Sequence, residues 1–207
     1  MFVRILQYDP SFYSVVINET DDVLTTVTAS GAKVDWWLNV VLNTHSDRLH
    51  ELVVGLDCEW FPCVGPNRNP TAVLQICVGR RCLIFQLLYA DYTPPSLIHF
   101  LQDARFTFYG AGINGDAQRL QEDKGLVLSN TVDLRDFAAE RMGRPELRNV
   151  GLARLAEVVM HIRMDKPRWV TLSNWDQRYL SHPQISYACA DAFISFEIGR
   201  RLRINRF

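Results

Sequence analysis

The stretch LVVGLDCEW, residues 52–60, decides the fold of this chain. Its first five residues are apolar, as expected for a buried β-strand, and Asp57 and Glu59 follow at the end of that strand. Because side chains alternate between the two faces of a strand, these two carboxylates point the same way. Two like charges on one face repel each other and are costly to desolvate. The stretch therefore indicates a divalent metal ion between the two acids.

The composition is that of an ordinary globular protein. The chain has 207 residues, 48% of them hydrophobic and 22% charged, which suits one domain with a substantial core. It contains no run of about 18 apolar residues, so we expect no membrane-spanning helix and no membrane partner. The N-terminus is too polar for a secretory signal, and the five cysteines are an odd number. Both features favour reduced thiols in the cytoplasm, with the nucleus as the alternative.

The net charge of −1 conceals an uneven distribution along the chain. Residues 1–59 carry three basic and nine acidic side chains, whereas basic residues gather at 135–168 and again at 200–206. This distribution suits a phosphate-bearing partner on one side of the molecule, although solvated helix faces would give the same pattern. The balance is far from the strongly basic one of a dedicated nucleic-acid binder.

The order of the expected elements predicts an α/β or α+β fold, with a mixed sheet flanked by helices. Strands are expected at 23–28, 52–57, 72–78, 82–87 and 106–109, with turns at 67–70 and 79–81. Helices are expected at 34–44, 96–102, 114–124, 136–142, 150–160 and 184–202.

Two further acids stand out in the second half of the chain. Asp116 ends the sequence GINGD at the start of an expected helix, where the dipole favours an anion; alone, it would be an ordinary helix N-terminal acid. Asp191 lies in the sequence YACADA and shares a helix face with Tyr187, four residues earlier. An aspartate among small apolar residues is costly unless it binds a metal or pairs with an arginine.

Taken together, these motifs resemble those of the Werner-type 3′–5′ exonucleases, in the DEDDy branch of the DEDD superfamily. The resemblance runs from about Leu52 to Leu202. Its motifs are Asp57-x-Glu59, GAGINGD at 110–116 and Tyr187-x-x-x-Asp191, supported by AVLQIC at 72–77 and SNWD at 173–176. It implies an RNase H-like fold, as in DnaQ-like exonucleases, with a central mixed β-sheet. It also implies a single exonuclease domain over 1–207, with a strand–helix extension at 1–50 and the catalytic core at 51–204.

The resemblance implies two Mg²⁺ or Mn²⁺ ions and hydrolysis of phosphodiester bonds from a free 3′ end, with release of nucleoside 5′-monophosphates. Two such ions can activate water and stabilise the leaving oxygen. Asp57 would bridge both ions, Glu59 and Asp191 would complete the site of the water-activating ion, and Asp116 would position the second. Tyr187 would orient the attacking water through a hydrogen bond.

Single-stranded nucleic acid is the expected substrate, with RNA favoured over DNA. The chain resembles the small stand-alone plant members of the group, including the RISC-interacting clearing exoribonucleases, in its length, its N-terminal extension and the sequence VGRRCLIF at 78–85. That resemblance implies RNA degradation, association with Argonaute and a homo-oligomer, specifically a hexamer. The competing hypotheses are a DNA-directed Werner-like exonuclease and a catalytically inactive scaffold of the same fold that binds RNA or protein.

Five residues near the motifs are candidate substrate contacts. Trp60 could stack on the terminal base, although core packing would use a tryptophan equally well. Lys166 and Arg168 are candidate phosphate contacts, with ordinary surface charge as the alternative. Cys58 and Asn114 are included because they adjoin the motif acids.

The cysteines offer a second metal hypothesis, a structural zinc site. Its ligands would be Cys58, Cys63, Cys77 and Cys82, which form two pairs with four intervening residues each. However, Cys58 faces away from the two acids on its strand, and Cys77 lies in an apolar strand. Small buried thiols are the commoner use of cysteine and are the expectation here.

Overall fold

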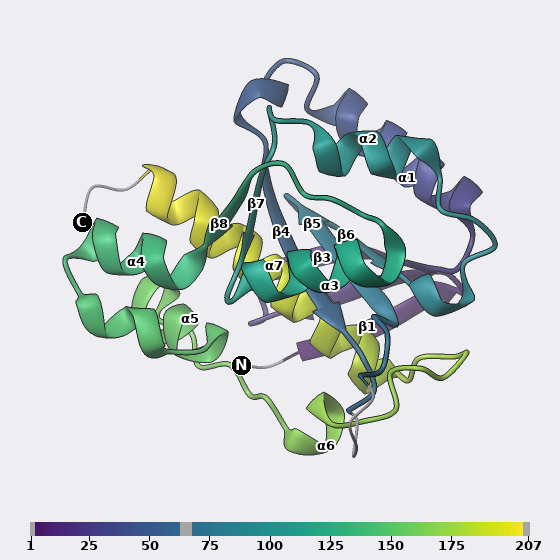
Figure 1. Ribbon diagram of the computed structural model, residues 1–207. Helices are drawn as coiled ribbons and strands as arrows, with labels where there is room; N and C mark the ends of the chain where they lie inside the picture. The colour runs from purple at the N-terminus through teal and green to yellow at the C-terminus, as the bar shows by residue number, and fades with distance from the viewer. Residues whose placement is uncertain (1–2, 63–67, 205–207) are drawn as a thin grey trace.

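The computed structural model describes residues 3–62 and 68–204 (Figure 1). Its centre is an eight-stranded sheet in the order β1-β2-β3-β6-β5-β4-β7-β8. The strands are β1 Val3–Asp9, β2 Phe12–Ile17, β3 Asp21–Thr28, β4 Val53–Glu59, β5 Val73–Val78, β6 Arg81–Phe85, β7 Thr107–Gly110 and β8 Thr131–Asp133. The β3–β6, β4–β7 and β7–β8 pairs are parallel and the other four are antiparallel, so the sheet is mixed, as the sequence predicts.

Helices cover both faces of this sheet (Figure 1). They are α1 Gly31–Thr44, α2 Pro95–Gln102, α3 Ile113–Lys124, α4 Leu134–Met142, α5 Leu152–Met160, α6 Arg168–Thr171 and α7 His182–Ile204. Short 3₁₀ turns lie at Leu49–Glu51, Leu87–Tyr89 and Pro145–Asn149. Among the residues that the structure describes, no helix is long and apolar enough to cross a bilayer.

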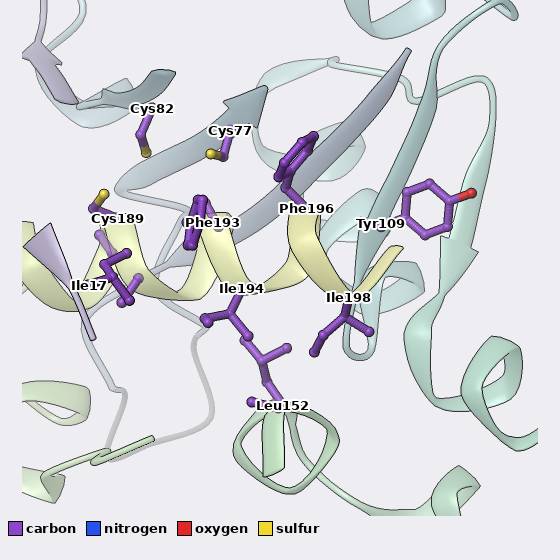
Figure 2. Packing of buried hydrophobic residues seen from close by; sticks show 14 of the residues in the cluster. Ile17, Cys77, Cys82, Tyr109, Leu152, Cys189, Phe193, Ile194, Phe196 and Ile198 are labelled. Carbon is purple, nitrogen blue, oxygen red and sulfur yellow. The ribbon is translucent and has the colours of Figure 1, made fainter. Parts of the chain in front are cut away.

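The sheet separates two hydrophobic cores. Apolar residues of α1, α2 and α3 pack on one face, and those of α4, α5 and α7 pack on the other. Figure 2 shows α7 within the second core, where Ile194 and Ile198 lie toward Leu152 of α5 and Phe193 lies toward the sheet. Fifteen residues of α7 are buried, so this helix is an internal support of the molecule.

The crossing of α7 over β4 is unusually close, and it brings the third sequence motif to the first. Val54, Leu56 and Cys58 of β4 point into the α1–α3 core. Gly55 faces α7, where an added Cβ would lie 2.0 Å from the carbonyl oxygen of Ala192. By the alternation of a strand, Asp57 shares the face of Gly55 and therefore lies toward α7, close to Asp191, the residue before Ala192.

The N-terminal part differs from the expected strand and helix. Three antiparallel strands, β1 to β3, precede α1 and extend the central sheet through the β3–β6 pair. The first of them escapes sequence analysis because β1 is an edge strand whose residues are mostly exposed, which removes the alternation of apolar and polar residues. The strands β2 and β8 and the four-residue helix α6 were also not expected. Within the turn expected at 67–70, Asn67 lies outside the described residues.

The described cysteines are buried thiols, as expected. Cys58 lies in the core beneath α1–α3, whereas Cys77 and Cys82 lie on the opposite face of the sheet beside Cys189 (Figure 2). Cys63, the remaining ligand of the zinc hypothesis, lies outside the described residues. Because the sheet separates Cys58 from the pair formed by Cys77 and Cys82, these three thiols cannot bind one zinc ion.

Candidate metal centre and active site

Three of the four motif acids meet where β4 passes under α7. Carboxylate oxygens of Asp57, Glu59 and Asp191 lie within 4.8 Å of one another. Asp57 and Glu59 are half-buried at the end of β4, and Asp191 is only 2% exposed on α7. The structure thus combines the two strand acids with an acid more than 130 positions away in the sequence.

The fourth acid, Asp116, lies on the same cavity but outside this group of three. It is buried in the first turn of α3, after Gly112, whose φ of 87° turns the chain from β7 into the helix. The cavity has a volume of about 580 Å³. Its wall includes all four acids together with Trp60, Arg119, Lys166 and Tyr187.

The electrostatics of the cavity show how costly the grouping of the acids is. Burial raises the pKa of Asp57 to about 7, and the charge of Asp191 adds to this effect while Lys166 opposes it. Burial, with a contribution from the charge of Asp57, raises the pKa of Asp116 to about 8. Burial and the charge of Asp57 also hold the pKa of Glu59 well above its ordinary range. The site therefore favours either protons or added positive charge.

Lys166 supplies positive charge inside this cluster. Its Nζ lies 2.6 Å from Oδ2 of Asp191 and 5.2 Å from the ring centroid of Tyr187. The other oxygen of Asp191, Oδ1, is buried and has no hydrogen-bond partner among the described residues. The sequence suggested a phosphate contact or surface charge for Lys166; its side chain is instead only 29% exposed and bound to a motif acid. Its role toward a substrate stays a prediction.

These residues fit a hard divalent cation. The donors are carboxylate oxygens, which Mg²⁺ and Mn²⁺ prefer, and one oxygen from each of three acids lies within 4.8 Å of the others. The unpartnered Oδ1 of Asp191 is a further indication, because a buried carboxylate oxygen is rarely left without a hydrogen bond or a metal.

Tyr187 lies on the cavity wall one turn before Asp191 on α7 and packs against Trp175, with ring centroids 6.0 Å apart. Burial and the charge of Asp191 raise the pKa of its phenol above the ordinary value. The phenol is therefore protonated at neutral pH and can donate a hydrogen bond from its O–H group. It is unsuited to act as a base.

Trp60 forms a stacked pair that sequence analysis did not anticipate. The guanidinium carbon of Arg119 lies 3.7 Å from the centroid of the Trp60 ring, a close cation–π contact. Arg119 also donates from Nη1 to the backbone oxygen of Asn69, 3.2 Å away. The sequence held one usable signal: Arg119 follows Asp116 by three residues and so shares its helix face.

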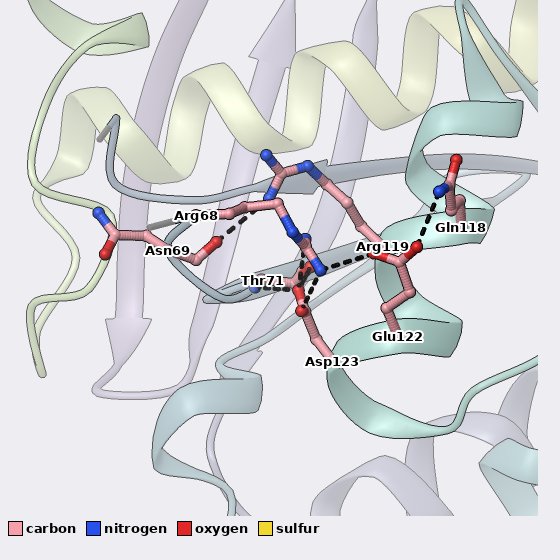
Figure 3. A network of polar contacts seen from close by, with 7 residues as sticks. All are labelled: Arg68, Asn69, Thr71, Gln118, Arg119, Glu122 and Asp123. Carbon is pink, nitrogen blue, oxygen red and sulfur yellow. Dashed lines mark hydrogen bonds and ion pairs between the residues drawn. The ribbon is translucent and has the colours of Figure 1, made fainter. Parts of the chain in front are cut away.

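A polar network holds α3 against the segment that follows β4 (Figure 3). The carboxylate of Asp123 accepts hydrogen bonds from Arg68 at 2.6 Å and from both the backbone nitrogen and the hydroxyl of Thr71, at 2.7 and 2.8 Å. Glu122 adds a second contact to Arg68 at 2.9 Å. The wall of the cavity around Trp60 and Asp116 is thereby fixed.

The remaining predicted contacts lie in less direct positions. The Cys58 side chain is buried in the core on the far face of β4, and its backbone nitrogen donates to Oδ1 of Asp57 at 3.0 Å. Asn114 and Arg168 are exposed and do not line the cavity within the part of the chain described. The structure does not bring these two side chains to the acids, and their contact with a substrate stays a prediction.

Residues 31–204 match a family model described as 3'-5' exonuclease. The chain belongs to this 3′–5′ exonuclease family. A 3'-5' exonuclease of Arabidopsis thaliana is 33% identical over 165 residues, which are 79% of this chain and 57% of that protein. The bifunctional exonuclease and helicase WRN of Mus musculus is 32% identical over 152 residues, 72% of this chain but 11% of that protein. The chain is thus a Werner-like member and spans only part of these relatives.

Solved structures agree with this assignment. The exonuclease domain of EXD2, in crystals soaked in Mn, is 28% identical with a TM-score of 0.50, over 86% of this chain and 89% of that one. RNase D of Escherichia coli superposes with a TM-score of 0.70 at 19% identity, over 87% of this chain and 44% of that one, which shows the shared fold. The mixed sheet with flanking helices is therefore the RNase H-like exonuclease fold, as the sequence predicts.

Proposed function

We propose that this protein is a metal-dependent 3′–5′ exonuclease that hydrolyses single-stranded nucleic acid, RNA in preference to DNA, and releases nucleoside 5′-monophosphates. The observation that carries this proposal is the convergence of Asp57, Glu59 and Asp191 within 4.8 Å, beside Tyr187 and Asp116 on one cavity. A protein of this fold that lacked these acids could not bind the metal ions that hydrolysis of a phosphodiester requires. Here the full set of acids and the tyrosine lines a cavity of sufficient size for a nucleotide.

Two Mg²⁺ or Mn²⁺ ions are the proposed cofactors. Asp57, Glu59 and Asp191 would hold one ion, and Asp57 with Asp116 would hold the other. When bound, such ions supply Lewis acidity and lower the pKa of a bound water. The all-oxygen donor set and the free Oδ1 of Asp191 support this assignment, as does the use of Mn in crystals of the EXD2 exonuclease domain.

The protein's own side chains would position the substrate. Tyr187 lies on the cavity wall with the acids, and its O–H group would orient the attacking water by a hydrogen bond. The Trp60 ring, which stacks on Arg119 and lies on the cavity wall, would stack on the terminal base. Burial at the floor of the cavity excludes bulk water and strengthens each of these interactions.

Other features of the proposal come from family resemblance. We propose that the protein is a single exonuclease domain, that it is located in the cytoplasm, that it forms a homo-oligomer such as a hexamer, and that it associates with Argonaute. Light scattering tests the oligomer directly, because a monomeric mass would contradict it. Pull-down of purified Argonaute tests the association.

A substrate panel tests the central proposal. Single-stranded RNA, single-stranded DNA and recessed duplexes, each with a 5′ label and either a free or a blocked 3′ end, are incubated with Mg²⁺ or Mn²⁺. We expect stepwise shortening of single strands with a free 3′ end, faster for RNA, and none in EDTA or with Asp57→Asn. If no substrate is shortened with either metal, the protein is a scaffold of this fold. Faster hydrolysis of DNA would instead favour the DNA-directed alternative.

A further inference from the structure

Lys166 is bound to a carboxylate for which a divalent cation would compete. Its Nζ lies 2.6 Å from one oxygen of Asp191. The carboxylate of Asp191 is grouped with those of Asp57 and Glu59. The free oxygen, Oδ1, is the natural ligand for an ion. An ion bound to Oδ1 would share the carboxylate of Asp191 with the ammonium of Lys166. A divalent and a monovalent cation so close together in a buried site repel strongly.

The segment that carries Lys166 permits its release. Residues 161–167 connect α5 to α6 without helix or strand, and the neighbouring Asp165 is exposed. The Lys166 side chain makes an ion pair with Asp191 and a second contact with the ring of Tyr187. The ammonium can therefore leave Asp191 by rotations of its own long side chain, without unfolding α5, α6 or α7.

The released ammonium would remain at the cavity. Lys166 is part of the cavity wall beside Tyr187, and its tether is only the length of a lysine side chain. Once a metal neutralises the acids, the ammonium needs another anionic partner. The phosphodiester of the substrate, when it enters the cavity, would be that partner. A flexible ammonium is a common ligand of phosphate.

We propose that Lys166 is the resident counter-cation of the metal-free site, that a divalent ion displaces it from Asp191, and that the displaced ammonium then contacts the phosphodiester of the entering strand. The last step rests on the exonuclease function proposed above. The first two steps do not, because they concern metal binding alone. Lys166 thus acts on the carboxylates in one state and on the substrate in the other.

The lysine content of the chain makes the displacement directly measurable. The chain has three lysines, Lys33, Lys124 and Lys166. An amine-reactive acylating reagent, followed by peptide mass spectrometry, reports how accessible each one is. In EDTA, Lys166 should be the slowest to react because it is bound to Asp191. Addition of Mn²⁺ should accelerate acylation of Lys166 by about fivefold or more, the range of an ordinary coupling between sites, while Lys33 and Lys124 serve as internal references.

A second measurement uses Mn²⁺ binding followed by electron paramagnetic resonance, with Lys166→Met and the charge-matched control Lys33→Met. Lys33 is exposed at the start of α1 and lies outside the cavity of the acids. We expect Lys166→Met to bind Mn²⁺ about fivefold or more tightly than the wild type, since no counter-cation has to leave, and Lys33→Met to bind as the wild type does.

The outcomes separate this inference from the proposed function. If the wild type binds no Mn²⁺, the metal site and the exonuclease proposal fail together. If it binds Mn²⁺ while Lys166 stays as protected as in EDTA, or if Lys166→Met binds no more tightly than Lys33→Met, the displacement is overturned and the exonuclease proposal stands. Labelling of the wild type decides the question even if Lys166→Met folds poorly. The last step is tested by binding of 5′-labelled RNA in Ca²⁺, which Lys166→Met should weaken and Lys33→Met should not.

Discussion

The buried carboxyl groups of the candidate site lower the stability of the folded protein when they are ionised. Asp57 and Asp116 have pKa values raised to about 7 and about 8, mainly by burial. Each is therefore more easily protonated in the folded chain than in the unfolded one. Linkage requires that the folded state loses stability as the pH rises through these values.

The first prediction concerns this pH dependence in the metal-free protein. A carboxyl with a raised folded pKa gives its full contribution below its unfolded pKa of 3.8 and loses it as the pH rises through about 7 to 8. In EDTA, we expect the free energy of unfolding to fall between about pH 4 and pH 8 and to level off above that range. At pH 8, Asp57→Asn should be more stable than the wild type by about 1–2 kcal/mol, because it removes one repelling charge.

Urea unfolding at several pH values measures both effects. The slope of stability against pH should be shallower in Asp57→Asn than in the wild type. A variant that is less stable than the wild type at pH 8 would contradict the account of a crowded acidic site.

The second prediction concerns Tyr187. Replacement by Phe keeps the ring that packs on Trp175 and removes the O–H group. Because the hydroxyl is proposed to orient water and not to bind metal, kcat should fall about 100-fold while Mn²⁺ affinity stays unchanged. Single-turnover hydrolysis and Mn²⁺ titration check the two halves. Full activity in the variant would exclude the proposed role.

Among the elements, the pair formed by β4 and α7 positions the site. Both are internal to the fold: β4 has strands on each side, and α7 has 15 buried residues. Gly55 permits their contact, since a Cβ there would lie 2.0 Å from the Ala192 carbonyl oxygen and 2.5 Å from the Phe196 nitrogen. The distance between Asp57 and Asp191 is therefore set by backbone packing.

The third prediction tests this crossing. Gly55→Ala should destabilise the protein by about 3 kcal/mol, because backbone atoms of α7 cannot move aside as a flexible side chain could. The control is Gly151→Ala, where an added Cβ meets nothing within 4 Å and the φ of −88° suits any residue. Thermal unfolding compares the two variants. Equal stability of Gly55→Ala and the wild type would mean that α7 does not lie this close to β4.

The elements of the site were predictable because their sequences are strongly patterned. The apolar run before Asp57 indicates a buried strand, and the spacing of Tyr187 and Asp191 indicates one face of a helix. Arg119 on Trp60 and Lys166 on Asp191 were not predictable. Both contacts join segments distant in sequence through long side chains, and local periodicity carries no information about such pairs. The edge strand β1 was missed for a different reason, since its exposure leaves no apolar alternation.

For the whole molecule, the sheet separates two cores, and the cavity of the acids is lined by residues of β4, α3 and α7. An ion that binds only the folded state shifts the unfolding equilibrium toward that state and so stabilises the whole protein. The fourth prediction follows. Mn²⁺ at about 100 times its dissociation constant should stabilise the protein by about 2.7 kcal/mol, seen as a rise in Tm. Asp57→Asn should show little of this rise.

The matched control for this measurement is ionic strength, held constant with NaCl. A rise in Tm that NaCl reproduces would be screening of charge and not occupation of a site. The mixed fold itself was predictable from the order of strands and helices. The family match begins at residue 31, with α1, and the expected boundary near residue 50 stays a prediction.

The close contact of β4 with α7 also limits how such a protein can diversify. Asp57 and Asp191 are carried by backbone segments on which both the core and the sheet depend, so a shift of either acid would disturb the packing of α7 on β4. Lys166 is carried by a connecting segment without helix or strand, and Trp60 directly follows the strand end. We expect changes at these two positions to leave the spacing of Asp57 and Asp191 unaltered. Contacts to a substrate can then vary while the acids keep their places.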